Sequence, residues 1–412
     1  MPSRPPRAFT RLEADLLAAA AVAGPWTRSG LEERLGEAGA ADPVLLARRV
    51  LDLMPGEPIE GESTVRNVLA ELPELPARPV EVTVESSLWK FDVPRWQTPH
   101  ALCQAFDLTM PELEWFADVQ GRLRGKPGRL HHYRYHNGAR LIEAPKVRLR
   151  EVQRRILRKV LDRLPVHAAA HGFRRGRSVH TFGSGHAGAD LVVRIDLRWF
   201  FSTITAARVR AVFLAVGYPP SVASLLAGLC TTATPVPILR GMPFEQATLL
   251  RTRHLPQGAP TSPALANMVA RNLDRRLAGL AQSQGLYYTR YADDLAFSGD
   301  VVNVEQLLWT VGAIVRDEGF FVHPSKTKVM RAHHRQRLAG LVVNAHPQAS
   351  RDDYEALKAL LYNCVRYGPA SQNRDGRTHF REHVSGHIAW VGESNSRRRE
   401  KLRRLEQRIV WS

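Results

Sequence analysis

The 412-residue chain combines a formal net charge of +18 with a hydrophobic content of 44%, which predicts a globular protein with a large core. Its cysteines, Cys103, Cys230 and Cys364, lie far apart and form no CxxC pair, so the sequence predicts neither a disulfide framework nor a structural zinc site. No apolar run approaches the ~20 residues that span a bilayer. We therefore expect no membrane segment and a cytoplasmic location.

The charge is distributed unevenly along the chain. Residues Met1–Arg95 carry 11 Lys and Arg side chains against 15 Asp and Glu side chains, a net charge of −4. The remaining residues carry 47 against 25, a net charge of +22. A concentrated positive charge of this size suits the phosphate backbone of a nucleic acid, where each neutralised phosphate releases counterions.

Residues 1–95 differ in composition from the rest of the chain. Apolar residues recur at helical spacing over Leu31–Leu53, which predicts a small helical module. A linker follows, and prolines interrupt it. These prolines are Pro55, Pro58, Pro73, Pro76 and Pro79. We find no residues in this part that indicate chemistry, so a docking or scaffold role is the default expectation.

Strands and helices are expected to alternate from Trp96 onward. The β-branched run Val192–Ile195 predicts a strand that ends at Asp196. Leu286–Tyr291 and Leu295–Ser298 predict two further strands that are joined by a tight turn.

Two helices are predicted from periodicity in the second half of the chain. Pro263–Leu280 is expected to form one helix, with Ser262 as its N-cap. Arg397–Ile409 is expected to form a basic helix with a narrow apolar face. That face consists of Leu402, Leu405 and Ile409.

The turn between the two predicted strands carries Asp293 and Asp294 after Tyr291. Adjacent carboxylates between apolar strands repel each other, and a divalent cation would neutralise them. Asp196 supplies a third carboxylate from a separate strand, which predicts a site for two metal ions about 3.5–4 Å apart that serve phosphoryl transfer. An ordinary Asp-rich turn and a helix N-cap are the structural alternatives for these residues.

The string His254–Pro263 predicts a ligand-binding loop that is followed by a helix. Gly258 lets the backbone approach a ligand closely, and Gln257 offers both a donor and an acceptor there. The helix start that follows is a favourable place for a phosphate. A generic loop-to-helix turn would explain the glycine but not the whole string.

In chain order, seven such strings resemble the conserved blocks of bacterial reverse transcriptases, those of retrons in particular. The resemblance extends from Trp96 to the C-terminal helix. The blocks are Arg140–Pro145 followed by Gln153, His171–Ser178, Ile195–Phe201, Leu255–Asn267, Tyr291–Asp294, Gly319–Lys328 and Leu338–Asn344. The resemblance implies an α+β right-hand polymerase: residues 96–345 would form the fingers and palm, 346–412 a thumb-like helical region, and 1–95 an additional N-terminal helical module.

The resemblance also implies roles for individual residues. Asp196, Asp293 and Asp294 would be catalytic and would hold two Mg²⁺ ions, for which Mn²⁺ can substitute. The incoming deoxynucleoside triphosphate would be contacted by four residues. Arg140 would bind its triphosphate, Phe201 would exclude a 2′-hydroxyl, Gln257 would lie near it, and Lys326 would protonate the leaving pyrophosphate.

Nucleic-acid contacts are expected toward the C-terminus. The block Leu338–Asn344 resembles the primer grip, where Gly340 would approach the primer. In the basic helix, Arg398, Arg403 and Arg404 would bind RNA along its backbone.

The chain departs from the retron pattern at two places. Retron enzymes often carry an Asn-Ala-x-x-His string where this chain has Phe182–His186, so only the histidine is kept. The usual Val-Thr-Gly is replaced by Leu338–Gly340. These departures leave the polymerase interpretation intact and bear on the subfamily and on its RNA partner.

The expected partners are a structured non-coding RNA that serves as template and primer, its cDNA, and a toxic or effector protein in defence against phage. A group II intron-like or other defence-associated reverse transcriptase is the alternative enzyme. A non-catalytic nucleic-acid-binding scaffold is the alternative from another class, although such a protein is expected to have lost at least one of the three carboxylates.

Overall fold

The computed structural model describes residues 11–38, 40, 43–54, 58, 61–71, 91–123, 126, 130–138, 140–300 and 303–411. The chain divides into two compact units, Met1–Ser87 and Leu88–Ser412. Most of the prolines of the expected linker, namely Pro55, Pro73, Pro76 and Pro79, lie outside the described residues.

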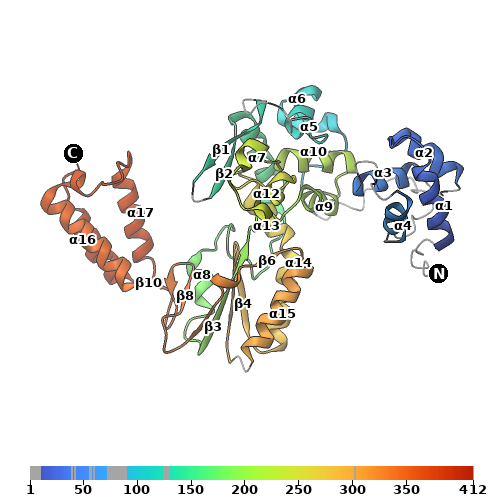
Figure 1. The fold of residues 1–412 in the computed structure, drawn as a ribbon. Helices are drawn as coiled ribbons and strands as arrows, with labels where there is room; N and C mark the ends of the chain where they lie inside the picture. The colour runs from blue at the N-terminus through green and yellow to red at the C-terminus, as the bar shows by residue number, and fades with distance from the viewer. Residues whose placement is uncertain are drawn as a thin grey trace. The chain divides into compact units, whose positions relative to one another are not determined.

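The first unit consists of helices in its described part (Figure 1). They are α1 (Arg11–Val22), α2 (Arg28–Glu37), α3 (Pro43–Leu53) and α4 (Glu62–Glu71). Leu31 and Leu35 are fully buried one turn apart on α2, and Leu46 and Val50 of α3 pack in the same core. The apolar residues that recur at helical spacing on α2 and α3 therefore contribute to the core of this unit.

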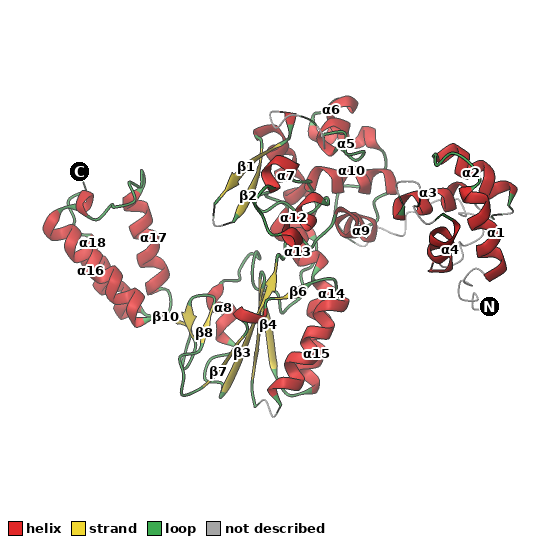
Figure 2. Cartoon of the chain, viewed as in Figure 1, coloured by secondary structure: helices red, strands yellow, loops and turns green. Residues whose placement is uncertain are grey.

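The second unit is a mixture of helices and strands (Figure 2). A hairpin near its start is formed by β1 (Tyr133–Asn137) and β2 (Leu141–Pro145). The helices before the third strand are α5 (Pro99–Phe106), α6 (Met110–Ala117), α7 (Val147–Lys159) and α8 (Val179–Ser184). The helices that follow it are α9 (Ala206–Val216), α10 (Pro220–Cys230), α11 (Val236–Leu239), α12 (Phe244–Arg251), α13 (Ser262–Val269), α14 (Arg271–Ser283) and α15 (Val304–Asp317).

A five-stranded sheet lies at the centre of this unit. Its order is β4–β5–β3–β6, with β7 also paired to β3. Its strands are β3 (Leu191–Arg198), β4 (Tyr287–Tyr291), β5 (Asp294–Ser298), β6 (Phe321–Val322) and β7 (Lys328–Arg331). The predicted strand pair is confirmed as β4 and β5, which pair antiparallel.

Alternation along β3 decides which face of the sheet each side chain occupies. Val193, Ile195 and Leu197 belong to the large core, which α14 and α15 cover (Figure 1). Val192 belongs to a smaller core on the opposite face. Because successive strand residues point to opposite faces, Asp196 projects from the face that α14 and α15 leave free.

The prediction that β3 ends at Asp196 is wrong, because the strand continues to Arg198. Leu197 and Arg198 pair with Val322 and Phe321 of β6. This pairing partner lies more than a hundred residues downstream, so local strand propensity does not show where β3 ends.

The prediction of one helix over Pro263–Leu280 is also wrong, because α13 and α14 are separated at Ala270. The N-cap is Thr261 rather than Ser262, whose hydroxyl donates to the backbone oxygen of Pro256 at 2.7 Å. The two helices pack against different elements, and their apolar residues nevertheless continue one helical spacing. The spacing alone therefore does not show where the first helix ends.

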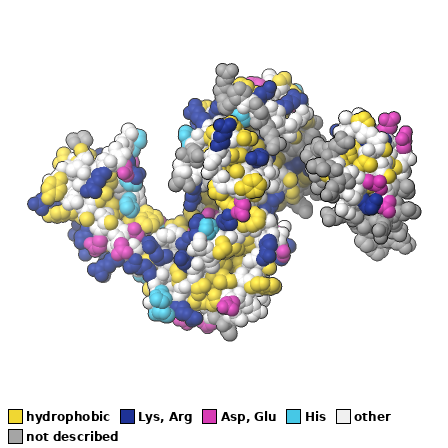
Figure 3. Space-filling model, in the orientation of Figure 1, with side chains coloured by type: hydrophobic (Ala, Val, Ile, Leu, Met, Phe, Trp, Pro, Cys, Tyr) yellow, Lys and Arg dark blue, Asp and Glu magenta, His cyan; other side chains and the backbone are white. Residues whose placement is uncertain are grey.

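The C-terminal part consists of a small sheet and three helices in the range that is described. The sheet contains β8 (Arg337–Leu338), β9 (Leu341–Val342) and β10 (Gln348–Ala349). The helices α16 (Arg351–Tyr367), α17 (Phe380–Gly392) and α18 (Ser396–Glu406) share a core of their own. Lys and Arg side chains gather along this helical region (Figure 3). Among the described residues, no helix has the length and apolar character needed to cross a membrane.

Candidate active site

Strand register brings two of the predicted carboxylates together. Asp196 on β3 is the direct partner of Asp294 on β5. Asp293 lies in the turn before Asp294, and its backbone oxygen accepts a hydrogen bond from the Leu197 amide at 2.9 Å. The turn therefore folds onto β3 directly beside Asp196, and three like charges are concentrated at one end of the sheet.

Burial makes this concentration of charge costly. Asp196 is only 6% exposed. Burial raises the pKa of Asp293, and the neighbouring Asp196 raises it further, while Arg140 and Lys326 oppose the shift. Burial also raises the pKa of Asp294, against the opposing effect of Arg194. The carboxylates are thus short of positive charge even with these basic side chains beside them.

Two basic side chains are paired with these carboxylates. Lys326 Nζ lies 3.2 Å from Asp196 Oδ1, and Arg194 Nε lies 3.0 Å from Asp294 Oδ1. Within the described ranges, no group of three or more His, Cys, Asp or Glu side chains is arranged around a common metal position. The donors are nevertheless carboxylate oxygens, which Mg²⁺ and Mn²⁺ prefer. The raised pKa values of Asp293 and Asp294 indicate a site where a divalent cation would offset negative charge.

A cavity of about 880 Å³ adjoins the carboxylates. Asp196 and Asp293 line it, whereas the Asp294 carboxylate is held by Arg194. The other residues that were predicted to contact a nucleotide also line it, and they come from separate segments. They are Arg140, Phe201, Gln257 and Lys326.

The two adjacent phenylalanines after Asp196 have different surroundings. Phe200 is 3% exposed and stacks on Phe320, with ring centroids 5.4 Å apart. Phe201 is partly buried, and its ring lies 6.0 Å from that of Phe173, which also lines the cavity. Both rings line the cavity, but Phe201 is the more accessible of the two, whereas Phe200 packs mainly in the core.

The loop that carries Gln257 is fixed to the β1–β2 hairpin. The backbone oxygen of Gln257 accepts a hydrogen bond from the Glu143 amide at 2.8 Å. Gly258 has a φ of +133°, and a Cβ there would lie 3.2 Å from the backbone oxygen of Glu143. A side chain at this position would therefore crowd the β1–β2 hairpin, so the close approach that glycine permits here is to the chain's own backbone; the expected approach to a ligand stays a prediction.

A buried polar pair beneath this loop was missed by sequence reasoning. His254 Nε2 lies 2.9 Å from Glu143 Oε2, and both side chains are almost completely buried. Thr234 donates to the other carboxylate oxygen at 2.6 Å. Glu143 lies in the block Arg140–Pro145, and His254 begins the string His254–Pro263. The two residues are separated by 111 positions, so no local sequence pattern indicates that they pair.

His186, the histidine kept in the divergent string, is also a buried structural residue. Its two ring nitrogens each lie 2.7 Å from a hydroxyl oxygen, that of Ser298 on β5 and that of Thr289 on β4. Burial lowers the pKa of His186 to about 3, so its ring is neutral at physiological pH. Its position joins the two strands of the aspartate hairpin.

The expected primer-grip block forms a tight hairpin. Leu338 of β8 pairs with Leu341 of β9, and both are fully buried. The turn residues Ala339 and Gly340 have φ angles of +45° and +87°. Positive φ at both central positions is the geometry of a type I′ turn, which matches the twist of paired strands.

The basic helix predicted over Arg397–Ile409 is observed as α18, which ends at Glu406 and not at Ile409. Leu402 is fully buried. Its arginines are not equivalent. Arg398 donates to the backbone oxygen of Ala349 at 3.2 Å and lies over the Tyr354 ring, so it holds α18 against the preceding elements.

The other two predicted arginines of α18 remain accessible. Arg403 and Arg404 are exposed and line a shallow groove together with Arg399. Arg404 also pairs with Glu400 at 2.5 Å on the exposed surface. Surface pairs of this kind contribute little free energy and do not prevent a phosphate contact.

Comparisons with known proteins agree with this arrangement. The family model for reverse transcriptase (RNA-dependent DNA polymerase) matches residues 126–355, more than half of the chain. The retron Mx65 reverse transcriptase of Myxococcus xanthus is 38% identical over 328 residues, which cover 78% of this chain and 74% of that protein.

Further relatives carry the same kind of name. The retron Mx162 reverse transcriptase of Myxococcus xanthus is 38% identical over 71% of this chain and 62% of its own length. The retron Ec86 reverse transcriptase of Escherichia coli is 30% identical over 64% of this chain and 74% of its own length. These matches favour the retron type over the intron-like alternative and an enzyme over a scaffold. The chain belongs to the reverse transcriptases, and it is an RNA-directed DNA polymerase of the retron type.

Proposed function

We propose that this enzyme copies part of a structured non-coding RNA into a short DNA that stays attached to that RNA, with a 2′-hydroxyl of the RNA as primer. The observation that supports catalysis most directly is the cavity beside Asp196 and Asp293, where residues from separate blocks of the chain converge. A polymerase site would require these distant segments to meet at one place.

The proposed architecture is that of a right hand. Residues 96–345 form fingers and palm, with the five-stranded sheet as the palm. Residues 346–412 form the thumb. Residues 1–95 are an additional helical module, whose acidic composition sets it apart from the basic polymerase.

Reverse transcriptases use divalent metal ions, and we assign their binding here to Asp196, Asp293 and Asp294. Two bound Mg²⁺ ions, or Mn²⁺ in their place, would supply activation of the attacking hydroxyl and stabilisation of charge on the leaving oxygen. The protein contributes the fixed turn at Asp293 and the cross-strand pair of Asp196 with Asp294. Lys326 and Arg194 limit the repulsion among these carboxylates.

The remaining cavity residues orient the nucleotide. Arg140 and Lys326 provide positive charge for the triphosphate, and the Lys326 ammonium is a source of a proton for the departing pyrophosphate. Phe201 packs beneath the sugar and excludes a 2′-hydroxyl. Gln257 is held beside the nucleotide by the hydrogen bond of its backbone to Glu143.

RNA is held mainly by the C-terminal region. Arg403 and Arg404 contact phosphates, and Gly340 lets the tight β8–β9 turn approach the primer strand. Arg398 supports the helix rather than the RNA, because its guanidinium is engaged by Ala349 and Tyr354.

The cellular role that we propose is defence against phage in the cytoplasm, together with a toxic or effector protein. The basis is the resemblance to retron enzymes.

Recovery of nucleic acid tests the proposal. The protein is purified from cells that express it with its neighbouring non-coding DNA, and the bound nucleic acid is sequenced before and after RNase treatment. We expect one DNA species whose 5′ end remains linked to an RNA nucleotide. A protein with Mg²⁺-dependent polymerase activity that carries only unlinked RNA would contradict the proposed priming.

A further inference from the structure

Arg290, directly before the aspartate hairpin turn, is completely buried and paired with Asp274 of α14. Its Nε lies 2.8 Å from Asp274 Oδ1, and its Nη2 lies 2.7 Å from Oδ2, so the contact is bidentate. Both side chains have no exposed surface. Tyr288 also donates to Asp274 Oδ1 at 2.9 Å, which satisfies a further lone pair of the carboxylate.

The same guanidinium reaches the turn that presents Asp293. Arg290 Nη1 donates to the backbone oxygen of Ala292 at 3.0 Å. Ala292 has a φ of +55°, a left-handed conformation that an alanine adopts at an energetic cost. Arg290 therefore stabilises the one turn residue whose backbone is strained.

A second contact holds the turn from the other side. A Cβ added to Gly172 would lie 2.5 Å from the Ala292 amide nitrogen, so only glycine allows this approach. The backbone oxygen of Gly172 accepts a hydrogen bond from Asn267 of α13 at 2.9 Å. The Arg290 backbone is also bonded to this segment, through Ala169 and His171. The turn is thus fixed by side chains from both α13 and α14.

A buried ion pair contributes little net free energy to folding. Desolvation of two charges offsets their attraction, and well-packed apolar residues of similar volume often serve as well or better. A role in orienting the turn explains the pair better. The planar guanidinium of Arg290 can bind the Asp274 carboxylate and the Ala292 carbonyl in fixed directions at the same time.

We infer that Arg290 and Asp274 are positioning residues that fix the Ala292–Asp293 turn and thereby set the affinity of the site for its divalent ions. This inference rests on the proposed assignment of the metal ligands. Neither side chain of the pair lines the nucleotide cavity. Arg290 reaches the site through neighbours of the cavity, by its hydrogen bond to the Ala292 carbonyl and by its position over the Phe200 ring, 5.8 Å from the ring centroid. Arg290 and Asp274 would support a metal ligand without binding the metal themselves. Loss of residues that support metal ligands in this way costs about 10–100-fold in metal affinity or activity.

Besides the conservative variant Arg290→Lys and a control, the experiment compares three variants with the wild-type protein: Arg290→Met, Asp274→Asn, and the double variant Arg290→Met with Asp274→Leu. Each is measured for melting temperature, for the Mg²⁺ concentration that half-saturates RNA-templated DNA synthesis, and for the shift in melting temperature during Mg²⁺ titration without substrate. The double variant matters most, because it removes both buried charges and leaves none unpaired.

We expect the single variants to melt at lower temperature, because each leaves one buried charge without its partner. The double variant is expected to recover most of that stability. Its Mg²⁺ requirement should nevertheless stay about 10–100-fold above that of the wild type, and its KM for the template–primer should be unchanged. Arg290→Lys should recover only part of the metal affinity, because an ammonium cannot bind the carboxylate and the carbonyl in the same geometry.

Arg276→Met is the matched control. Arg276 lies on α14, as Asp274 does, and forms ion pairs with Asp317 and Glu318 at the surface. Its loss should therefore leave the Mg²⁺ requirement at the wild-type value. Recovery of both stability and Mg²⁺ requirement in the double variant would overturn the inference, because the pair would then act through stability alone. Absence of Mg²⁺-dependent synthesis in the wild-type protein would instead refute the proposed function.

Discussion

Lys326 Nζ lies 3.2 Å from Oδ1 and 3.3 Å from Oδ2 of Asp196, so one ammonium faces both oxygens of a proposed metal ligand. Asp196 is buried, whereas the Lys326 side chain is 46% exposed. The ammonium can therefore move into the cavity when a divalent ion replaces it at the carboxylate. Two consequences can be separated by experiment: competition with the metal, and donation of a proton to pyrophosphate.

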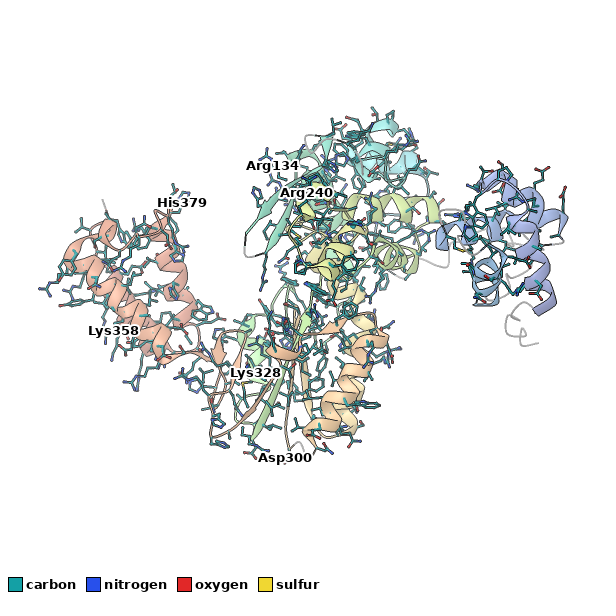
Figure 4. The ribbon with its side chains drawn as sticks, viewed as in Figure 1. Arg134, Arg240, Asp300, Lys328, Lys358 and His379 are labelled. Atoms are coloured by element: carbon teal, nitrogen blue, oxygen red, sulfur yellow. The ribbon has the colours of Figure 1, made fainter. Side chains whose placement is uncertain are left out.

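Lys326→Met should lower the Mg²⁺ concentration needed for half-maximal activity, because the competing cation is removed. It should also lower kcat by about 10²-fold, the smaller end of what a positioned general acid contributes. Steady-state kinetics at several Mg²⁺ concentrations measures both effects. Lys328→Met is the control, since Lys328 is an exposed neighbour on β7 (Figure 4). An increased Mg²⁺ requirement in Lys326→Met would show that the ammonium assists metal binding.

Asp293→Asn should abolish Mg²⁺-dependent DNA synthesis and leave the protein folded, because the site loses a charge but little volume. The raised pKa of Asp293 adds a prediction about stability. A carboxyl whose pKa is higher in the folded state destabilises the fold at a pH above that pKa, and the effect disappears below its unfolded pKa. Without metal, Asp293→Asn should therefore melt higher than the wild type at pH 7.5, with a smaller difference at pH 5.

Melting curves with and without Mg²⁺ complete this test. Added Mg²⁺ should raise the melting temperature of the wild type and have little effect on the variant. A well-folded Asp293→Asn protein with full activity would refute the assignment of this residue.

Phe201→Ala should raise the incorporation of ribonucleotides relative to deoxyribonucleotides, because it opens space beneath the sugar. Phe200→Ala should leave sugar selection unchanged and cost roughly 3–5 kcal/mol of stability, since Phe200 stacks on Phe320 in the core. Primer extension with mixed nucleotides and a denaturant titration measure the two effects. The opposite pattern would mean that Phe200 is the gate.

Arg403→Gln combined with Arg404→Gln should weaken RNA binding similarly for several sequences. The slope of log affinity against log salt should also flatten by about 0.7–0.9 for each phosphate that the protein no longer neutralises. Arg398→Gln is the comparison on the same helix. Because its guanidinium contacts Ala349 and Tyr354, this substitution should lower the melting temperature and leave the salt slope nearly unchanged. Equal salt slopes for wild type and the double variant would show that this face of α18 does not contact RNA.

The elements that depend on a short-range pattern were predictable from the sequence. Adjacent carboxylates between two alternating apolar strands define a hairpin, and β4 and β5 pair as expected around Asp293. The spacing between Asp196 and Phe201 and the glycine at 258 are likewise local features. Their convergence on one cavity followed from the family resemblance rather than from the spacing itself.

Tertiary structure alone decided which buried polar groups are partners. Nothing in the local sequence pairs Arg290 with Asp274, or His254 with Glu143, because those contacts join different elements. The same applies to Arg398, which is indistinguishable from Arg403 along the helix until the fold places Ala349 and Tyr354 beside it. Periodicity records which face of an element is buried, but a partner is selected by distance and geometry in the folded chain. For this protein the sequence was enough to identify the polymerase family and to predict three carboxylates for its site, and the fold determined which residues hold those carboxylates in place.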